Sequence, residues 1–181
     1  MKRANIRFNY QDYLQLPEDK RYEILDGDLY VVPAPNIRHQ RVCKRIGYAL
    51  IRRIEKKGIG EVLCAPCDVV LSDENVTQPD ILVVLKEHLG IISEANIRGA
   101  PDLVIEILSP STRQKDLAIK RKIYAGFGIQ EYWIVEPDAA TIEVLTWKPS
   151  GYTLAGTYAE ADRLSSPLLP DLDLELREIF R

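Results

Sequence analysis

The sequence predicts a mixed α/β protein in which helices pack on a β-sheet. Apolar residues recur every three or four positions over residues 37–57, which indicates a long amphipathic helix. Runs rich in Ile, Val and Leu lie on either side of a second helical segment over 111–126. Some of these runs are apolar on both faces, which is typical of strands covered on both sides. Helices and strands do not alternate strictly, so we expect a mixed sheet.

Length and composition favour one soluble globular domain over residues 1–181. The chain has 181 residues, against roughly 150 for a typical domain. It is 46% hydrophobic and 28% charged, which excludes a disordered or low-complexity chain. No apolar stretch approaches the ~20 residues that span a bilayer, and no secretory signal follows the N-terminus. Three cysteines are too few for a disulfide scaffold. We therefore expect a cytoplasmic protein without a membrane partner.

The elements follow from caps, turns and periodicity. Asn9 caps a short helix that ends before Pro17. Asp26-Gly27 is typical of a tight turn and predicts a hairpin between strands 22–25 and 29–32. The first long helix, 37–57, ends at a glycine, and Ser111 with Gln114 predicts a capping box for the second. The remaining predicted strands are residues 61–71, 78–85, 102–108, 132–135, 141–147 and 152–157.

Basic residues are concentrated in two segments although the net charge is −3. Residues 36–60 hold eight Lys or Arg side chains against one acid, and residues 111–124 hold five against one. Such segregation allows one face to attract a polyanion. The alternative is an ordinary solvated helix face. The side chains expected to contact nucleic acid are Arg41, Arg45, Arg52, Arg113 and Arg121.

Three acids lie in apolar strands: Asp80, Asp102 and Glu106. An ionised carboxylate is costly to bury unless a metal ion or another cation lies nearby. Asp102 and Glu106 share a strand face but lie about 13 Å apart, too far to bind one ion. Asp80 and Glu106 lie on different strands, and neighbouring strands are about 4.8 Å apart. This pair is therefore the candidate Mg²⁺ site, with Mn²⁺ as a substitute. The alternative is that a Lys or Arg partners each carboxylate separately.

The second helix contributes a lysine to the same site. At ~100° per residue, Lys120 falls inside the apolar arc of this helix together with Asp116, whereas Lys115 points elsewhere. A buried Lys needs an anionic partner. The simpler alternative is an Asp116–Lys120 pair within the helix. Two carboxylates, a divalent cation and an inward Lys suit phosphodiester hydrolysis.

An ordered set of motifs resembles the putative restriction endonuclease family of the PD-(D/E)XK nuclease superfamily over roughly residues 10–175. The motifs are Tyr22-Glu23-Ile24-Leu25-Asp26-Gly27, His39 at a helix start, Gln78-Pro79-Asp80, Pro101-Asp102-Leu103-Val104-Ile105-Glu106-Ile107-Leu108-Ser109-Pro110-Ser111, Asp116 with Lys120-Arg121 and Tyr124, and Glu131-Tyr132-Trp133-Ile134-Val135. The resemblance implies a restriction endonuclease-like mixed sheet flanked by helices, after an N-terminal hairpin. It also implies Mg²⁺-dependent cleavage of DNA by a homodimer.

The resemblance also implies residue roles. Asp80 stands for the motif Asp and Glu106 for the motif acid. The motif Lys is expected at position 108, which is Leu108 here, and Lys120 fits the place of a helix-borne substitute. Glu23 matches a position near the site, as a further ligand of metal or water. His39 matches another, with a packing role as its alternative.

Two competing interpretations stay open at this point. Cys64 and Cys67, with Cys43 and His39 one helical turn apart, make an incomplete zinc pattern. Side chains three apart in a strand face opposite sides, which disfavours it. The second interpretation is a catalytically inactive nucleic-acid-binding or interaction module on the same fold, which Leu108 favours.

Overall fold

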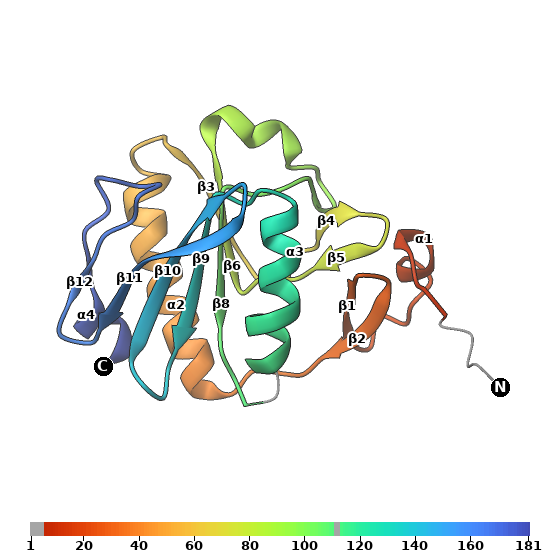
Figure 1. Ribbon diagram of the computed structural model, residues 1–181, viewed down its shortest axis with the longest axis horizontal. Helices are drawn as coiled ribbons and strands as arrows, with labels where there is room; N and C mark the ends of the chain where they lie inside the picture. The colour runs from red at the N-terminus through yellow and green to blue at the C-terminus, as the bar shows by residue number, and fades with distance from the viewer. Residues whose placement is uncertain (1–5, 111–112) are drawn as a thin grey trace.

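A computed structural model describes residues 6–110 and 113–181, with the backbone alone at residue 116. Within these residues, two main β-sheets lie side by side, with helices on both faces of the larger one, and a third sheet has only two strands (Figure 1). This architecture confirms the predicted mixed α/β class. No helix among the described residues is both long enough and apolar enough to span a membrane.

The larger sheet has six strands within the described residues, in the order β11-β10-β9-β8-β6-β3. Strands β8 and β9 are parallel and the other neighbours are antiparallel, so the sheet is mixed. The strands are β3 (Gly60–Cys64), β6 (Ile81–Leu85), β8 (Leu103–Ile107), β9 (Glu131–Glu136), β10 (Thr141–Lys148) and β11 (Gly151–Ala159).

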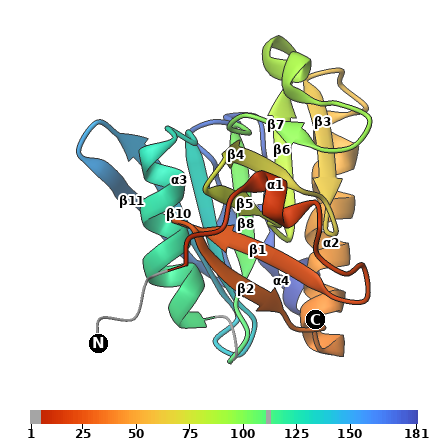
Figure 2. The same ribbon diagram turned by 90° about the vertical axis from the view of Figure 1, so that its right-hand side faces the viewer.

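The central strand β8 packs on both faces. Alternate residues of a strand point to opposite faces. Leu103 and Ile105 join a core with α2 (Ile37–Ile54), whereas Val104 joins a second core with α3 (Arg121–Gly126). Figure 2 shows the two helices on opposite sides of this sheet. The elements that complete the α2 side are β12 (Arg163–Leu164), β13 (Leu174–Glu175) and α4 (Leu176–Phe180).

The smaller sheet has the order β2-β1-β5-β4-β7 in the described part of the chain. The predicted hairpin forms its edge: Asp26 and Gly27 have φ of 49° and 77°, as such a turn requires. Asn9 caps a short helix, α1 (Tyr10–Tyr13), beside it. The strands are β1 (Arg21–Leu25), β2 (Asp28–Val32), β4 (Val69–Ser72), β5 (Asn75–Thr77) and β7 (Ile97–Arg98).

Two predicted strands are wrong in extent. The predicted strand 61–71 is two strands, β3 and β4, which belong to different sheets. The predicted strand 78–85 contains only β6, which begins at Ile81; β5, which belongs to the other sheet, ends before it at Thr77. Pro66 and Pro79 lie at the breaks, and proline has no N–H to continue a ladder. After β6 the chain forms a short 3₁₀ helix, η1 (Lys86–Ile91), which was not predicted.

Both long helices also differ from prediction. The first helix ends at Ile54 instead of residue 57. After it, Ile59 N donates to Ile54 O, and Gly58 has a positive φ of 65°, which turns the chain out of the helix. The second begins with a π-helical turn, η2 (Lys115–Lys120), which continues into α3. The predicted capping box at Ser111 lies outside the described residues.

Candidate active site

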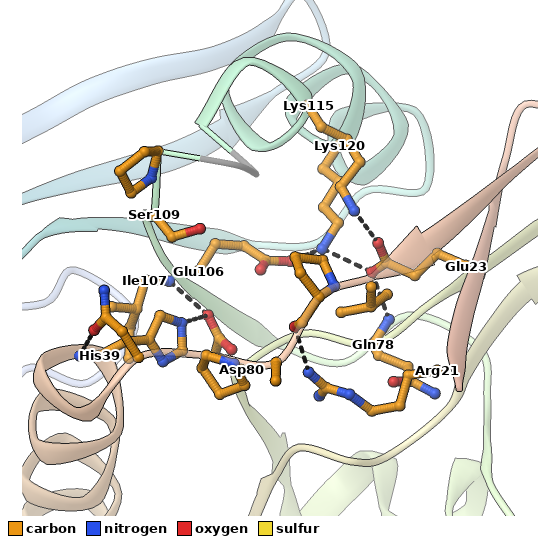
Figure 3. A pocket seen from close by; sticks show the side chains of 16 residues that line it. Arg21, Glu23, His39, Gln78, Asp80, Glu106, Ile107, Ser109, Lys115 and Lys120 are labelled. Carbon is orange, nitrogen blue, oxygen red and sulfur yellow. Dashed lines mark hydrogen bonds and ion pairs between the residues drawn. The ribbon is translucent and has the colours of Figure 1, made fainter. Parts of the chain in front are cut away.

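A cleft of about 240 Å³ opens where the smaller sheet meets one end of the larger sheet. Its walls come from β1, the chain before β6, the carboxyl end of β8, and the starts of α2 and η2. Figure 3 shows charged side chains from these elements pointing toward one another. Segments far apart in the sequence therefore line one cleft.

Asp80 and Glu106 both line this cleft. Ile81 pairs with Ile105 across the antiparallel strands β6 and β8, and the same register sets Asp80 opposite Glu106 one position further. Facing residues on antiparallel neighbours have Cβ atoms roughly 5 Å apart on one face of the sheet. The fold thus brings together the two carboxylates predicted to bind a metal; the role itself stays a prediction.

The Asp80 carboxylate is held by two groups at Oδ2. The backbone N–H of Ile107 donates to it over 2.8 Å, and His39 Nε2 lies 3.1 Å away. Asn36 positions the histidine, since its side-chain oxygen caps α2 by accepting from His39 N. His39 Nδ1 is buried and has no hydrogen-bond partner within the described residues. The histidine therefore contacts the site and does not serve packing alone.

Glu106 is buried and receives two donors at Oε1. Lys120 Nζ lies 2.9 Å away and the Tyr124 hydroxyl 2.7 Å away. Burial, followed by the charge of Glu106, raises the pKa of Tyr124 well above its ordinary value, so the phenol remains a donor. The predicted inward direction of Lys120 is correct, and two of its partners, Glu106 on β8 and Glu23 on β1, lie on other elements. The side chain of Asp116, its alternative partner, lies outside the described residues.

Glu23 reaches the cleft from β1 and joins the two sheets. Its Oε1 accepts from Gln78 N at 2.9 Å and lies 2.8 Å from Lys120 Nζ, and its Oε2 accepts from Lys115 Nζ at 2.6 Å. Burial favours the neutral acid, but the charges of Lys120 and Lys115 outweigh it and lower the pKa of Glu23. Glu23 thus contacts both lysines of the cleft. The role that the resemblance implies, a further ligand of metal or water, stays a prediction.

Lys115 is a site residue that sequence reasoning missed. The expectation that it points away from Lys120 assumed α-helical spacing and is wrong. A helix with 3.6 residues per turn separates positions five apart by about 140°. The wider π-turn, closed by i→i+5 bonds, brings them nearly into line. π-turns occur frequently at functional sites, but no residue type in the sequence signalled this one.

Asp102 lies at the other end of β8 and not in the cleft. It is buried and accepts hydrogen bonds from Leu85 N at 2.7 Å and Gln130 Nε2 at 3.0 Å, while His88 Nδ1 lies 2.7 Å away. Its burial is therefore explained by neighbouring donors. The expectation that it cannot share an ion with Glu106 is consistent with this placement.

The five arginines expected to contact nucleic acid do not line the cleft. Arg45 donates to Ile179 O at 3.0 Å, and the Arg52 guanidinium lies over the Tyr48 ring, 5.6 Å from its centroid. Both line a separate groove beside α4. Of the others, Arg41 is exposed, Arg113 pairs with Glu136 and Arg121 is half-buried. The cleft instead receives its positive charge from Arg21, Lys115 and Lys120.

The donor set fits a hard divalent cation. Facing carboxylates supply oxygen ligands, and Mg²⁺ is commonly held by one or two carboxylates together with water and substrate phosphates. Among the described residues, no group of three or more His, Cys, Asp or Glu side chains is placed to hold a metal. Cys43, Cys64 and Cys67 are free thiols. The residues thus fit an open site shared with substrate, and not a closed zinc site.

Known proteins are similar to this chain over most of its length. The family model Uma2, described as "Putative restriction endonuclease", matches residues 10–177. An uncharacterized protein of Synechocystis sp. is 26% identical over 160 residues, which cover 85% of this chain and 82% of that protein. A crystal structure of a putative nuclease belonging to DUF820 from Anabaena variabilis has a TM-score of 0.78 at 21% identity, covering 96% of this chain and 97% of the other. At that identity it shows a common fold.

Proposed function

The chain belongs to the Uma2 family of putative restriction endonucleases, and from this premise we propose that it is a Mg²⁺-dependent endonuclease that hydrolyses phosphodiester bonds of DNA. The observation that carries the proposal is the facing pair Asp80 and Glu106 in one cleft, with the Lys120 ammonium 2.9 Å from Glu106. Buried charged groups contribute little net stability, and a cluster of them beside a cavity is typical of functional sites.

The proposal assigns Asp80 and Glu106 to hold the cation. A bound Mg²⁺ or Mn²⁺ would polarise a phosphoryl oxygen and lower the pKa of a bound water. The backbone N–H of Ile107 and the His39 ring fix the orientation of Asp80, and the Tyr124 hydroxyl fixes that of Glu106. Removing a group that orients a metal ligand typically lowers metal affinity or activity 10–100-fold.

Lys120 is proposed to stabilise negative charge on the phosphate. Position 108, where the family motif expects Lys, is a buried leucine in the core beneath α3. The Lys120 ammonium enters the cleft from the helix instead, held between Glu23 and Glu106. An ammonium fixed in a partly dry cleft stabilises developing charge more strongly than one in water.

Cleavage of supercoiled plasmid by the purified protein tests the proposal. We expect nicking with Mg²⁺ or Mn²⁺, none with EDTA, and loss of at least a hundredfold in Asp80→Ala and Glu106→Ala. The matched control is Glu160→Gln, which removes an exposed acid outside the cleft and leaves the rate unchanged. Equal cleavage by wild type and both cleft variants would assign the activity to a contaminant and defeat the proposal.

The inactive binding module is the second candidate, and Leu108 is the observation that favours it. It predicts metal-dependent DNA binding without cleavage in every divalent cation. Calorimetric Mn²⁺ binding and plasmid cleavage on the same sample separate the two functions.

We propose in addition that the chain acts as one domain, as a homodimer in the cytoplasm. Light scattering on the purified full chain would give twice the 20.6 kDa mass of the chain for a dimer. A mass equal to one chain at assay concentration would contradict the dimer.

A further inference from the structure

We propose that Lys115 is a second substrate-binding cation of the cleft, which contacts a phosphate of the nucleic acid alongside the one that Lys120 faces. The inference rests on the proposed function, because it assigns the nucleic-acid backbone as the ligand. Its basis is the π-helical turn η2, which places Lys115 and Lys120, five residues apart, on the same carboxylate of Glu23.

Lys115 faces the cleft at its rim. Its side chain is 12% exposed, compared with 4% for Lys120 and 0% for Glu23. The ammonium lies 2.6 Å from Glu23 Oε2 and 5.7 Å from the centroid of the Tyr30 ring. Both partners lie on the hairpin, so a single ordered position is favoured. Of the two lysines, Lys115 is therefore the one that an entering anion reaches first.

Lys115 gives Glu23 a cation in addition to the one that Glu23 shares with Glu106. Lys120 Nζ lies 2.8 Å from Glu23 and 2.9 Å from Glu106, whereas Lys115 Nζ contacts Glu23 alone among these acids. Lys115 is thus bound by one carboxylate while its other side borders the cavity. A cation in that position is placed to meet an entering anion.

The formal charges that line the cleft also favour an anionic ligand. Three carboxylates line it, Glu23, Asp80 and Glu106, against three cations, Arg21, Lys115 and Lys120. These formal charges balance when no divalent cation is bound. A divalent cation on Asp80 and Glu106 would leave an excess of positive charge, which favours an anion such as a phosphodiester. Lys115 is placed to contact this anion while it keeps its contacts with Glu23 and Tyr30 on the hairpin.

Salt-dependent DNA binding tests this inference. Affinity for a 20-base-pair duplex is measured by fluorescence anisotropy with Ca²⁺ in place of Mg²⁺, over a series of NaCl concentrations. A lysine that meets a phosphate contributes roughly 0.9 to the slope of log affinity against log salt. We expect Lys115→Met to bind about tenfold more weakly and to lose about one unit of that slope. Lys115→Arg keeps the slope.

Lys122→Met is the matched control, because Lys122 is an exposed lysine on the adjoining helix α3. It should retain the wild-type slope. Calorimetric Mn²⁺ affinity should be unchanged in Lys115→Met, which separates phosphate contact from loss of the metal site. Thermal unfolding identifies a misfolded variant, in which case Lys115→Gln replaces it.

The two proposals fail in different ways. Equal slopes for Lys115→Met and Lys122→Met would overturn the assignment of Lys115, whether or not the protein cleaves DNA. A wild-type protein that binds DNA but never cleaves it would overturn the endonuclease, while a slope loss confined to Lys115→Met would still support the second cation. A wild-type protein that binds no DNA would overturn both.

Discussion

Two buried acids, four residues apart, lie at the two ends of strand β8 in different surroundings: Asp102 directly precedes the strand, and Glu106 is its second-last residue. Asp102 lies at one end, where a backbone N–H, an amide and a half-exposed histidine surround it. Glu106 lies at the other end, where an ammonium and a phenol hold it beside a cavity. Burial alone does not distinguish them. The neighbours do: loop and amide donors surround Asp102, whereas a cation beside a cleft holds Glu106, the acid proposed to bind a metal.

The largest difference in cleavage rate is expected between two variants in which each acid is replaced by its amide, Glu106→Gln and Asp102→Asn. Glu106→Gln removes charge from the proposed metal site, so cleavage should fall about a thousandfold, or ~4 kcal/mol of transition-state stabilisation. Asp102→Asn should cleave within threefold of wild type. Initial rates of plasmid nicking at matched metal concentration measure both. Comparable losses in the two variants would remove the distinction drawn above.

Glu23→Ala should cause the largest loss of stability at the cleft. It leaves Lys115 and Lys120 buried with one carboxylate fewer, and breaking a buried pair costs about 3–5 kcal/mol. Urea unfolding followed by circular dichroism measures the change. Glu74→Ala is the control, because it breaks the exposed pair with Arg7. That pair should be worth at most ~1 kcal/mol.

At the structural end of β8, Asp102→Ala should destabilise the fold by about 2 kcal/mol. It leaves the Leu85 N–H and the Gln130 amide without their acceptor. Hydrogen exchange should rise first in η1, which Asp102 ties to the sheet through His88. Unchanged exchange in η1 would show that the carboxylate does not hold it.

Tyr124→Phe should have a smaller effect at the functional end. It removes one hydrogen bond to Glu106 while Lys120 remains, at a cost of ~1 kcal/mol. Because Tyr124 positions the carboxylate, Mn²⁺ affinity should weaken about tenfold. Calorimetry measures it. A loss of stability with no change in Mn²⁺ affinity would make Tyr124 a packing residue only.

Near neutral pH the stability should not change with the ionisation of Glu23, and a pH dependence is expected only in acid. Its pKa is lower in the folded than in the unfolded protein, so its charge stabilises the fold above the unfolded value of about 4.3. That contribution is lost as pH falls through the folded pKa. The unfolding free energy of wild type should therefore fall more steeply below pH ~4.3 than that of Glu23→Gln. Parallel curves would contradict the assigned ionisation.

The sequence predicted most of the charged residues of the cleft, but not the second sheet and the π-turn that bring them together. Asp80, Glu106, Lys120, Glu23 and His39 were predicted near one site, and all of them line it. Carboxylates in apolar strands and an inward lysine are visible in a sequence because burial of charge is costly. Their catalytic roles remain predictions.

What was missed depends on backbone geometry that residue types do not encode. The smaller sheet was not predicted because the chain crosses between the two sheets near Pro66 and Pro79, at or inside segments that were each predicted as one strand. Lys115 was placed on the wrong side because a π-turn changes the angle per residue. Tyr124 was assigned to the apolar arc, since its ring packs there while its hydroxyl bonds Glu106.

Glu23 and Lys115 lie 92 positions apart in the chain, and their contact closes only once the hairpin has docked. Without that docking, Lys115 and Lys120 would lack the Glu23 carboxylate that both of them contact. The positions of the two ammonium groups therefore depend on long-range tertiary structure and not on the local sequence of η2.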